Sequence, residues 1–186
     1  MAQFDFNETN IKDLYIITPS IFGDNRGYFM ETYNKNEFSK SGLDMDFVQD
    51  NQSKSKKGVL RGLHFQKNYP QGKLVRVLKG KVFDVAVDLR YDSDTYSQWY
   101  GVILSEENKK QFYVPEGFAH GFLVLSVEAE FAYKCTDFYH PEDEGGIIWN
   151  DPEINIDWPL NELNEIILSD KDKGLKKLNE QNIKFK

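Results

Sequence analysis

The sequence predicts an all-β fold, either a sandwich or a jelly roll, on three observations. Phenylalanine and tyrosine are abundant, with 14 and 10 copies in 186 residues, and aromatic side chains pack well on a pleated sheet. Short apolar runs recur along the chain, separated by turn signals. Several runs alternate with a period of two: between 82 and 89 the odd-numbered residues are all apolar, while Asp84 and Asp88 belong to the even-numbered face.

The predicted strands follow one another at short intervals. Turn signals such as Lys79-Gly80-Lys81 and Pro115-Glu116-Gly117 separate them. In chain order the expected strands cover 14–19, 27–33, 47–53, 59–65, 73–80, 81–90, 98–104, 111–115, 121–126 and 130–139.

Helix is scarce in this pattern. Residues 34–42 predict a short helix, with Asn34 as its N-cap and Gly42 just past its end, and 168–182 predict another near the C-terminus. No repeat, low-complexity segment or linker interrupts the chain. We therefore expect a single domain over 1–186, a length that suits one substantial core.

Composition narrows the function classes. The formal net charge of −7 argues against general binding to nucleic acid or to an anionic membrane. No run approaches the roughly 20 apolar residues of a membrane span. The N-terminal stretch MAQFDFNETN lacks the basic and apolar regions of a signal peptide, so a cytoplasmic protein is expected. The single cysteine, Cys135, excludes an internal disulfide and is expected to be buried.

Polar residues within the apolar strands are the informative exceptions. In VLRGLHFQ (59–66), Arg61 and His64 are an odd number of residues apart, so a regular strand would point them to opposite faces. Gly62 between them suggests a bulge that re-aims one of them. Asp84 alternates with apolar neighbours and is expected to project inward. With Lys73, Arg76, His120 and Tyr133 on other strands, these residues predict a polar pocket inside the barrel.

The histidines argue against a metal site. Small β-barrels of the cupin type usually present two histidines one residue apart, but here His64 is followed by Phe65 and Gln66. The other histidines stand at 120 and 140, far along the chain. No P-loop, dinucleotide-binding or nucleophile-elbow motif is present. What remains is cofactor-free acid–base chemistry on an anionic ligand such as a diphosphate, which arginine binds well.

Taken together, the motifs of this chain resemble the dTDP-4-dehydrorhamnose 3,5-epimerase family. The resemblance covers roughly residues 12–172 in the family's order, and no single motif would carry it. The matching segments are FGDNRGYFMETYN (22–34), FVQDNQSKSKKGVLRGLHFQ (47–66), QGKLVRV (71–77), VFDVAVDLR (82–90), PEGFAHGF (115–122), EFAYKCTDFY (130–139), EGGIIWNDPEINIDWP (144–159) and LSDKD (168–172).

The resemblance implies a cupin-type jelly roll that works as a homodimer on a dTDP-sugar without a metal or other cofactor. It places the catalytic base at His64 and the proton donor at Tyr133. The aspartate that orients the base falls on Asp172, with Asp170 as the weaker candidate. Lys73 falls on a position with both a catalytic and a binding role. The positions linked to substrate binding are Arg26, Glu31, Gln49, Asn51, Arg61, Lys73, His120, Glu144 and Lys171.

The implied reaction is the inversion of C3 and C5 in dTDP-4-dehydro-6-deoxy-D-glucose, on the way to dTDP-L-rhamnose. Two alternatives stay open at this point. The nearer one is a mono-epimerase that acts at C3 or C5 only. The farther one is a non-catalytic cupin that binds a sugar nucleotide.

Overall fold

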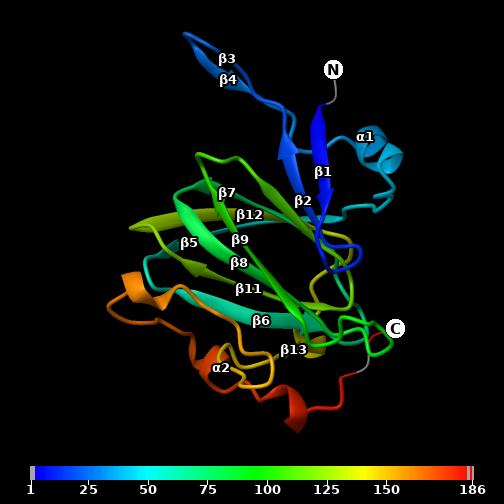
Figure 1. Cartoon of the computed structure of the whole chain (residues 1–186), viewed down its shortest axis with the longest axis vertical. Coiled ribbons are helices and arrows are strands. Elements are labelled where there is room, and N and C mark those ends of the chain that lie inside the picture. The colour runs from blue at the N-terminus through cyan, green and yellow to red at the C-terminus, as the bar shows by residue number, and fades with distance from the viewer. Residues whose placement is uncertain (1–2, 184, 186) are drawn as a thin grey trace.

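Two antiparallel sheets face each other as the walls of a barrel in the computed structural model, which describes residues 3–183 and 185 (Figure 1). The six-stranded sheet has the order β1 (Phe4–Glu8), β2 (Tyr15–Pro19), β10 (Gln111–Val114), β7 (Lys73–Lys79), β12 (Glu128–Cys135), β5 (Gln49–Lys56). The five-stranded sheet has the order β13 (Glu144–Gly146), β6 (Leu60–Gln66), β11 (Phe118–Val124), β8 (Lys81–Asp88), β9 (Trp99–Ser105). The predicted all-β jelly roll is confirmed.

The barrel interior is an apolar core that both sheets share. On β8, Val82 and Ala86 contribute to this core, whereas Val85 and Val87 pack on the outer face of the same sheet. The period-two alternation read from the sequence is therefore correct. The inner core consists of Ile11, Leu14, Val75, Val77, Val82, Ala86, Val102, Leu104, Phe112, Val114, Phe118, Phe122, Val124, Ala129 and Phe131.

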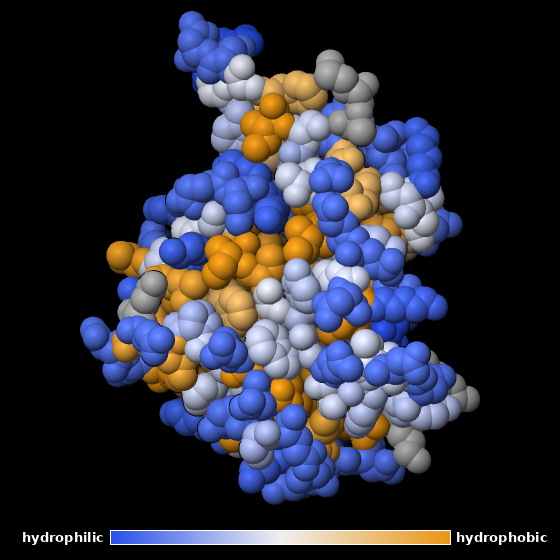
Figure 2. Space-filling model, viewed as in Figure 1, coloured by the Kyte–Doolittle hydropathy of each residue, from blue (hydrophilic) through white to orange (hydrophobic). Residues whose placement is uncertain are grey.

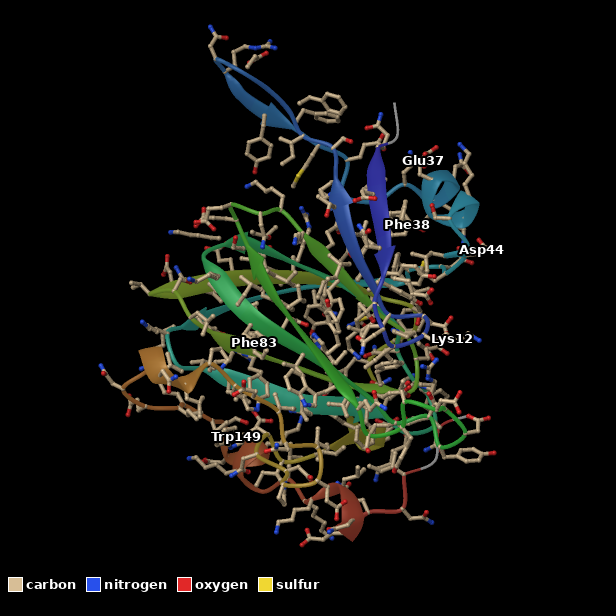
Figure 3. All side chains as sticks on the ribbon, in the orientation of Figure 1. Lys12, Glu37, Phe38, Asp44, Phe83 and Trp149 are labelled. Atoms are coloured by element: carbon tan, nitrogen blue, oxygen red, sulfur yellow. The ribbon has the colours of Figure 1, made fainter. Side chains whose placement is uncertain are left out.

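The C-terminal segment covers the outer face of the five-stranded sheet. Ile147, Trp158 and Leu178 belong to one buried cluster with Leu63 of β6. The side chain of Phe83 also joins this layer, on the lower side of the barrel in Figure 3. This layer matters for function because it carries the helix α2 (Asp170–Lys173) under β6.

A second layer covers part of the six-stranded sheet. It centres on α1 (Lys35–Lys40), whose N-cap Asn34 accepts hydrogen bonds from the backbone of Asn36 and Glu37, as the sequence predicts. Phe38 lies on the side of α1 that faces β1 and makes an edge contact with the ring of Phe4, at 5.2 Å between centroids (Figure 3).

The predicted helix over 168–182 is wrong in its length. α2 ends at Lys173, and a separate 3₁₀ turn covers Leu178–Glu180. Between them, Lys176 forms a parallel bridge with Ile147, and its carbonyl accepts from the backbone of Ile148. The backbone pairs with another segment there, so its hydrogen bonds are no longer available to a helix.

Some strand limits also differ from prediction. The strand expected over 27–33 ends at Phe29, because β3 (Phe22–Asp24) and β4 (Gly27–Phe29) form a separate two-stranded hairpin. The strand expected over 130–139 ends at Cys135, and β1, β3 and β13 were not predicted.

The β3–β4 hairpin, here called the arm, stands away from the barrel (Figure 1). Its apolar side chains are exposed: Phe29 is 66% and Tyr28 57% accessible, and Phe22 and the adjacent Ile21 are exposed as well. Figure 2 shows a hydrophilic tip, and apolar surface both at the base of the arm and on the barrel face below it. Such a combination on a projecting hairpin indicates a contact surface.

Candidate active site

A cavity of about 680 Å³ lies between the two sheets and receives side chains from both. β6 and β11 supply Arg61, His64 and His120 from the five-stranded sheet. The six-stranded sheet supplies Lys73 and Tyr133 from β7 and β12. The remaining polar lining residues are Gln49, Asn51, Ser53, Gln71, Tyr139, Glu144, Ser169, Lys171 and Asp172.

A bulge in β6 brings Arg61 and His64 to the same cavity. His64 pairs with His120 of β11, and Arg61 pairs with Phe122. Arg61 and His64 are three residues apart, whereas their partners are two residues apart, so β6 holds one extra residue at this point. Gly62 adopts a φ of +128°, and a Cβ there would lie 2.6 Å from the Cα of Gly121. Only glycine fits this close approach. The bulge that the sequence suggests at Gly62 is thus present.

His64 forms a hydrogen-bonded pair with Asp172. Its Nε2 lies 2.5 Å from Oδ1 of Asp172, which is 3% exposed. The second oxygen of Asp172 accepts from the hydroxyl of Ser169, at 2.8 Å, and Ser169 in turn caps α2 by accepting from the backbone of Asp172. Asp170 points elsewhere: its side chain is fully exposed and pairs with Lys173. The structure therefore places Asp172, and not Asp170, beside His64.

The environment keeps Asp172 ionised. Burial opposes ionisation, but the hydrogen bonds from His64 and Ser169 and the nearby Lys171 outweigh it, so the pKa of Asp172 is lowered. A carboxylate at Nε2 favours the tautomer in which Nε2 carries the proton. The other ring nitrogen, Nδ1, is then able to accept a proton.

Tyr133 reaches the cavity from the opposite wall. It stands on β12 of the six-stranded sheet, whereas His64 stands on β6 of the five-stranded sheet. Burial, with Cys135 and Glu144 nearby, raises the pKa of the Tyr133 phenol, and the positive charge of Arg61 opposes the rise. The phenol consequently holds its proton at neutral pH, as a proton donor must.

Lys73 lines the cavity from β7, the strand next to β12, which carries Tyr133. It pairs across the sheet with Cys135, and its Nζ lies 3.5 Å from the carbonyl of Gln71. Burial lowers the pKa of Lys73, against the effects of Cys135 and Glu144. Cys135 is buried as predicted, and its sulfur accepts from Asn51 at 3.6 Å.

Charged and aromatic groups form the rim of the cavity. Nζ of Lys171 lies 2.5 Å from Glu144, and the hydroxyl of Tyr139 donates to the other oxygen of the same carboxylate. Burial opposes ionisation of Glu144, but Lys171 and Tyr139 lower its pKa. Gln49 accepts from the backbone of Tyr139 and donates to Asn51. These contacts link both sheets at the rim.

The cavity gathers ten of the twelve predicted site residues. The exceptions are Arg26 and Glu31: Arg26 lies on the arm with its side chain paired to Asp24, and Glu31 follows the arm and accepts from Asn34. Sequence reasoning did not select Ser169, Tyr139 or Gln71. The Ser169-x-x-Asp172 spacing, typical of a helix N-cap, was the available signal for the first.

Within the part of the chain that the structure describes, no three His, Cys, Asp or Glu side chains gather as they would to hold a metal ion. In the same part, no helix is long and apolar enough to cross a membrane.

Comparison with known proteins gives a consistent result. Residues 8–180 match the family described as dTDP-4-dehydrorhamnose 3,5-epimerase. A dTDP-4-dehydrorhamnose 3,5-epimerase of Methanothermobacter thermautotrophicus is 57% identical over 180 residues, which are 97% of each chain. The crystal structure of the 3,5-epimerase from Legionella pneumophila, in complex with dTDP-4-keto-L-rhamnose, superposes with a TM-score of 0.94 at 52% identity, covering 98% of this chain and 99% of that one.

A protein of narrower activity has the same fold. The 3'-monoepimerase of Streptomyces bikiniensis, in complex with dTDP-quinovose, superposes with a TM-score of 0.85 at 30% identity, covering 92% of this chain and 86% of that one. The greater identity thus lies with the double epimerases.

Proposed function

The chain belongs to the dTDP-4-dehydrorhamnose 3,5-epimerase family, and we propose that the cavity between its sheets is the active site. The protein is an isomerase that converts dTDP-4-dehydro-6-deoxy-D-glucose to dTDP-4-dehydro-L-rhamnose in dTDP-L-rhamnose synthesis. The roles of its residues follow from the chemistry of that conversion and from the positions of the side chains.

Each inversion requires three groups. The C4 carbonyl of the sugar acidifies the protons at C3 and C5, so that a base can remove either one. Removal gives an enolate whose negative charge rests on the C4 oxygen. A proton delivered from the opposite face then inverts the carbon. A base, an acid across the cavity and a donor or cation near the C4 oxygen are therefore sufficient.

His64 takes the role of the base. Asp172 holds Nε2, so Nδ1 is the nitrogen that accepts the sugar's proton. As the imidazolium forms, the carboxylate of Asp172 stabilises its charge. Ser169 supports this carboxylate from its other side and limits its rotation.

Tyr133 takes the role of the acid. The observation that carries the proposal is that Tyr133 and the His64–Asp172 pair line one cavity from opposite sheets. A sugar ring held between the two walls would present one face to the imidazole and the other to the phenol. Inversion, rather than simple exchange of a proton, needs this arrangement.

Two cations of the cavity act on different parts of the substrate, one on the sugar and the other on the diphosphate. Lys73 is well placed to stabilise the enolate oxygen, because it is half-buried on the strand next to Tyr133. Arg61 is exposed at the cavity and its Nε donates to Ser55, which leaves the outer guanidinium nitrogens for phosphate oxygens. Gln49, Asn51, His120, Glu144 and Lys171 supply further polar contacts to the substrate.

Arg26 and Glu31 act in a second subunit. Neither lines the cavity of its own chain, and the arm that carries Arg26 projects with exposed apolar side chains. A homodimer in which each arm packs on its partner would bury these side chains. It would also bring Arg26 to the partner's nucleotide. A cytoplasmic location remains the expectation from the sequence.

The test is the reaction of the purified protein with dTDP-4-dehydro-6-deoxy-D-glucose in D₂O, followed by NMR. We expect inverted product with deuterium at both C3 and C5. Inversion at one carbon alone would identify a mono-epimerase. Tight binding without exchange at either carbon would identify a non-catalytic binding protein.

A further inference from the structure

A second histidine–aspartate pair stands beside the first. His120 of β11 is in register with His64 of β6, and its Nε2 lies 2.7 Å from Oδ1 of Asp84 on β8. Asp84 is fully buried, and His120 lines the cavity. The two imidazoles thus share one cavity, and each has its Nε2 turned to a carboxylate.

The two carboxylates differ in what supports their second oxygen. Oδ2 of Asp172 accepts from Ser169. Oδ2 of Asp84 is buried and has no hydrogen-bond partner among residues 3–183 and 185. Its neighbours on the inner face of β8 are Val82 and Ala86, which belong to the apolar core. An ionised carboxylate is poorly solvated in such a place, since only one of its oxygens is satisfied.

An apolar residue at 84 would pack in this core without that cost. Packing therefore does not explain why residue 84 is an aspartate. The hydrogen bond with His120 is the interaction that an apolar residue could not make. Burial raises the pKa of Asp84, while the charge and hydrogen bond of His120 oppose the rise. The surroundings favour a pair with no net charge over a pair with a buried negative charge.

Resting on the function proposed above, we propose that Asp84 is a positioning residue that keeps the His120 pair electrically neutral, so that His120 presents its Nδ1–H as a hydrogen-bond donor to the enolate oxygen at C4. A neutral pair holds two protons. The first proton lies between Nε2 of His120 and Oδ1 of Asp84 and can be bonded to either atom. The second proton is on Nδ1 of His120 in both cases. The His64 pair has the opposite property, because its supported carboxylate leaves Nδ1 unprotonated.

The other titratable groups around His120 influence whether Nδ1 holds its proton. They are Asp84 on β8, His64 and Arg61 on β6, Tyr133 on β12 and Lys73 on β7. Arg61 and Lys73 are cations and disfavour a positive His120, whereas an enolate in the cavity favours it. A donor on Nδ1 would act together with Lys73 on the same oxygen. No bond to carbon forms or breaks at His120.

The experiment is ¹⁵N NMR of the histidine rings in the whole protein, with and without bound dTDP, at neutral pH. The variant His140→Asn, outside the cavity, assigns one of the three rings. We expect Nδ1 of His120 to be protonated in the unmodified protein and unprotonated in Asp84→Asn, where the amide oxygen accepts from Nε2 instead. An unprotonated Nδ1 in the unmodified protein overturns the proposal.

Kinetics separate positioning from stability. Asp84→Asn should lower kcat by about 10²-fold, the usual effect of losing one oxyanion donor, with a smaller change in KM. The control is Asp151→Asn, another buried aspartate, which accepts from the backbone of Glu153, Ile154 and Leu178 outside the cavity. It should lower the melting temperature and leave kcat nearly unchanged.

An unchanged kcat in folded Asp84→Asn overturns the proposal. If that variant does not fold, the ring spectrum of the unmodified protein still decides, because the proposal requires a protonated Nδ1 there. Failure of the unmodified protein to epimerise the 4-keto sugar would overturn the proposed function instead, and the ring spectrum does not depend on that outcome.

Discussion

At the scale of residues, the proposed mechanism depends on which groups hold a proton at neutral pH. Asp172 is ionised because His64, Ser169 and Lys171 offset its burial, and Tyr133 is protonated because burial raises its pKa. Their surroundings thus leave the proposed base, His64, with a free Nδ1 and the proposed acid, Tyr133, with its proton. A single cavity can then remove a proton on one side and deliver one on the other.

The role of Tyr133 can be separated from that of His64 by comparing exchange with inversion. Tyr133→Phe keeps the ring and removes the hydroxyl. His64 would still remove a proton and return a deuteron to the same face. We therefore expect deuterium from D₂O to enter the sugar while inverted product falls sharply. NMR measures the ratio of deuterium uptake to inversion against the unmodified protein. An unchanged ratio would remove Tyr133 from the mechanism.

The lowered pKa of Asp172 has a consequence for stability. A carboxyl group whose pKa is lower in the folded state stabilises that state above its unfolded pKa, about 3.9, and loses this effect as the pH falls through the folded value. Asp172→Asn should cost about 1.5 to 3 kcal/mol at pH 7, as for hydrogen bonds to a charged group. Denaturant unfolding at several pH values should show this difference shrinking below about pH 4. A difference independent of pH would contradict the assignment.

At the scale of elements, two features position the site. The Gly62 bulge in β6 turns Arg61 and His64 to one cavity, and the C-terminal layer carries α2 with Asp172 under the same strand. The arm is a further element, and in the proposal above it acts on a second chain. The apolar side chains of the arm are largely exposed in the single chain, and Nζ of Lys109 lies over the ring of Tyr28.

Mixed dimers test the arm directly. Suppose that each site takes His64 from one chain and Arg26 from the other. A mixed dimer, with Arg26→Ala in one chain and His64→Ala in its partner, then has one intact site and one site that carries both substitutions. Coexpression of the two inactive variants should restore about a quarter of the activity, from random pairing in a two-fold dimer. The protein should scatter light as a particle of twice 21.7 kDa.

The controls for this experiment are the two variants alone, each assayed as its own dimer. No recovery on mixing, with both variants folded and dimeric, would place Arg26 in the site of its own chain or outside any site.

At the scale of the whole molecule, the sequence was sufficient for the class of fold and for part of the site. Alternation along β8 correctly placed Asp84 inside the barrel, and Gly62 between two polar residues correctly indicated a bulge. Both are local signals, carried by the neighbours of the residue concerned.

Long-range contacts could not be derived from local patterns. His64 and Asp172 are 108 residues apart, so only the family resemblance connected them before the structure did. The helix expected over 168–182 failed for a similar reason, because Lys176 pairs with the distant Ile147. The unpartnered oxygen of Asp84 depends on packing from several strands and has no signature in the sequence.

Chemistry without a metal is a further expectation for the molecule as a whole. Dialysis against EDTA should leave the epimerase activity intact, because in the proposed mechanism side-chain donors and a lysine stabilise the enolate. The measurement is activity before and after chelation, with Zn²⁺, Mn²⁺ or Fe²⁺ added back in parallel. Activity lost to the chelator and restored by one of these ions would show that the cavity binds a metal.

The central claim is that His64, held by Asp172, removes the protons at C3 and C5, and His64→Ala in D₂O tests it most directly. NMR measures the rates of deuterium uptake and of inversion at both carbons, and titration with dTDP checks that the nucleotide still binds. We predict that both rates fall by about 10² to 10⁴, the range for a positioned acid or base, with dTDP affinity retained through Arg61. Deuterium uptake at a rate near that of the unmodified protein would contradict the account.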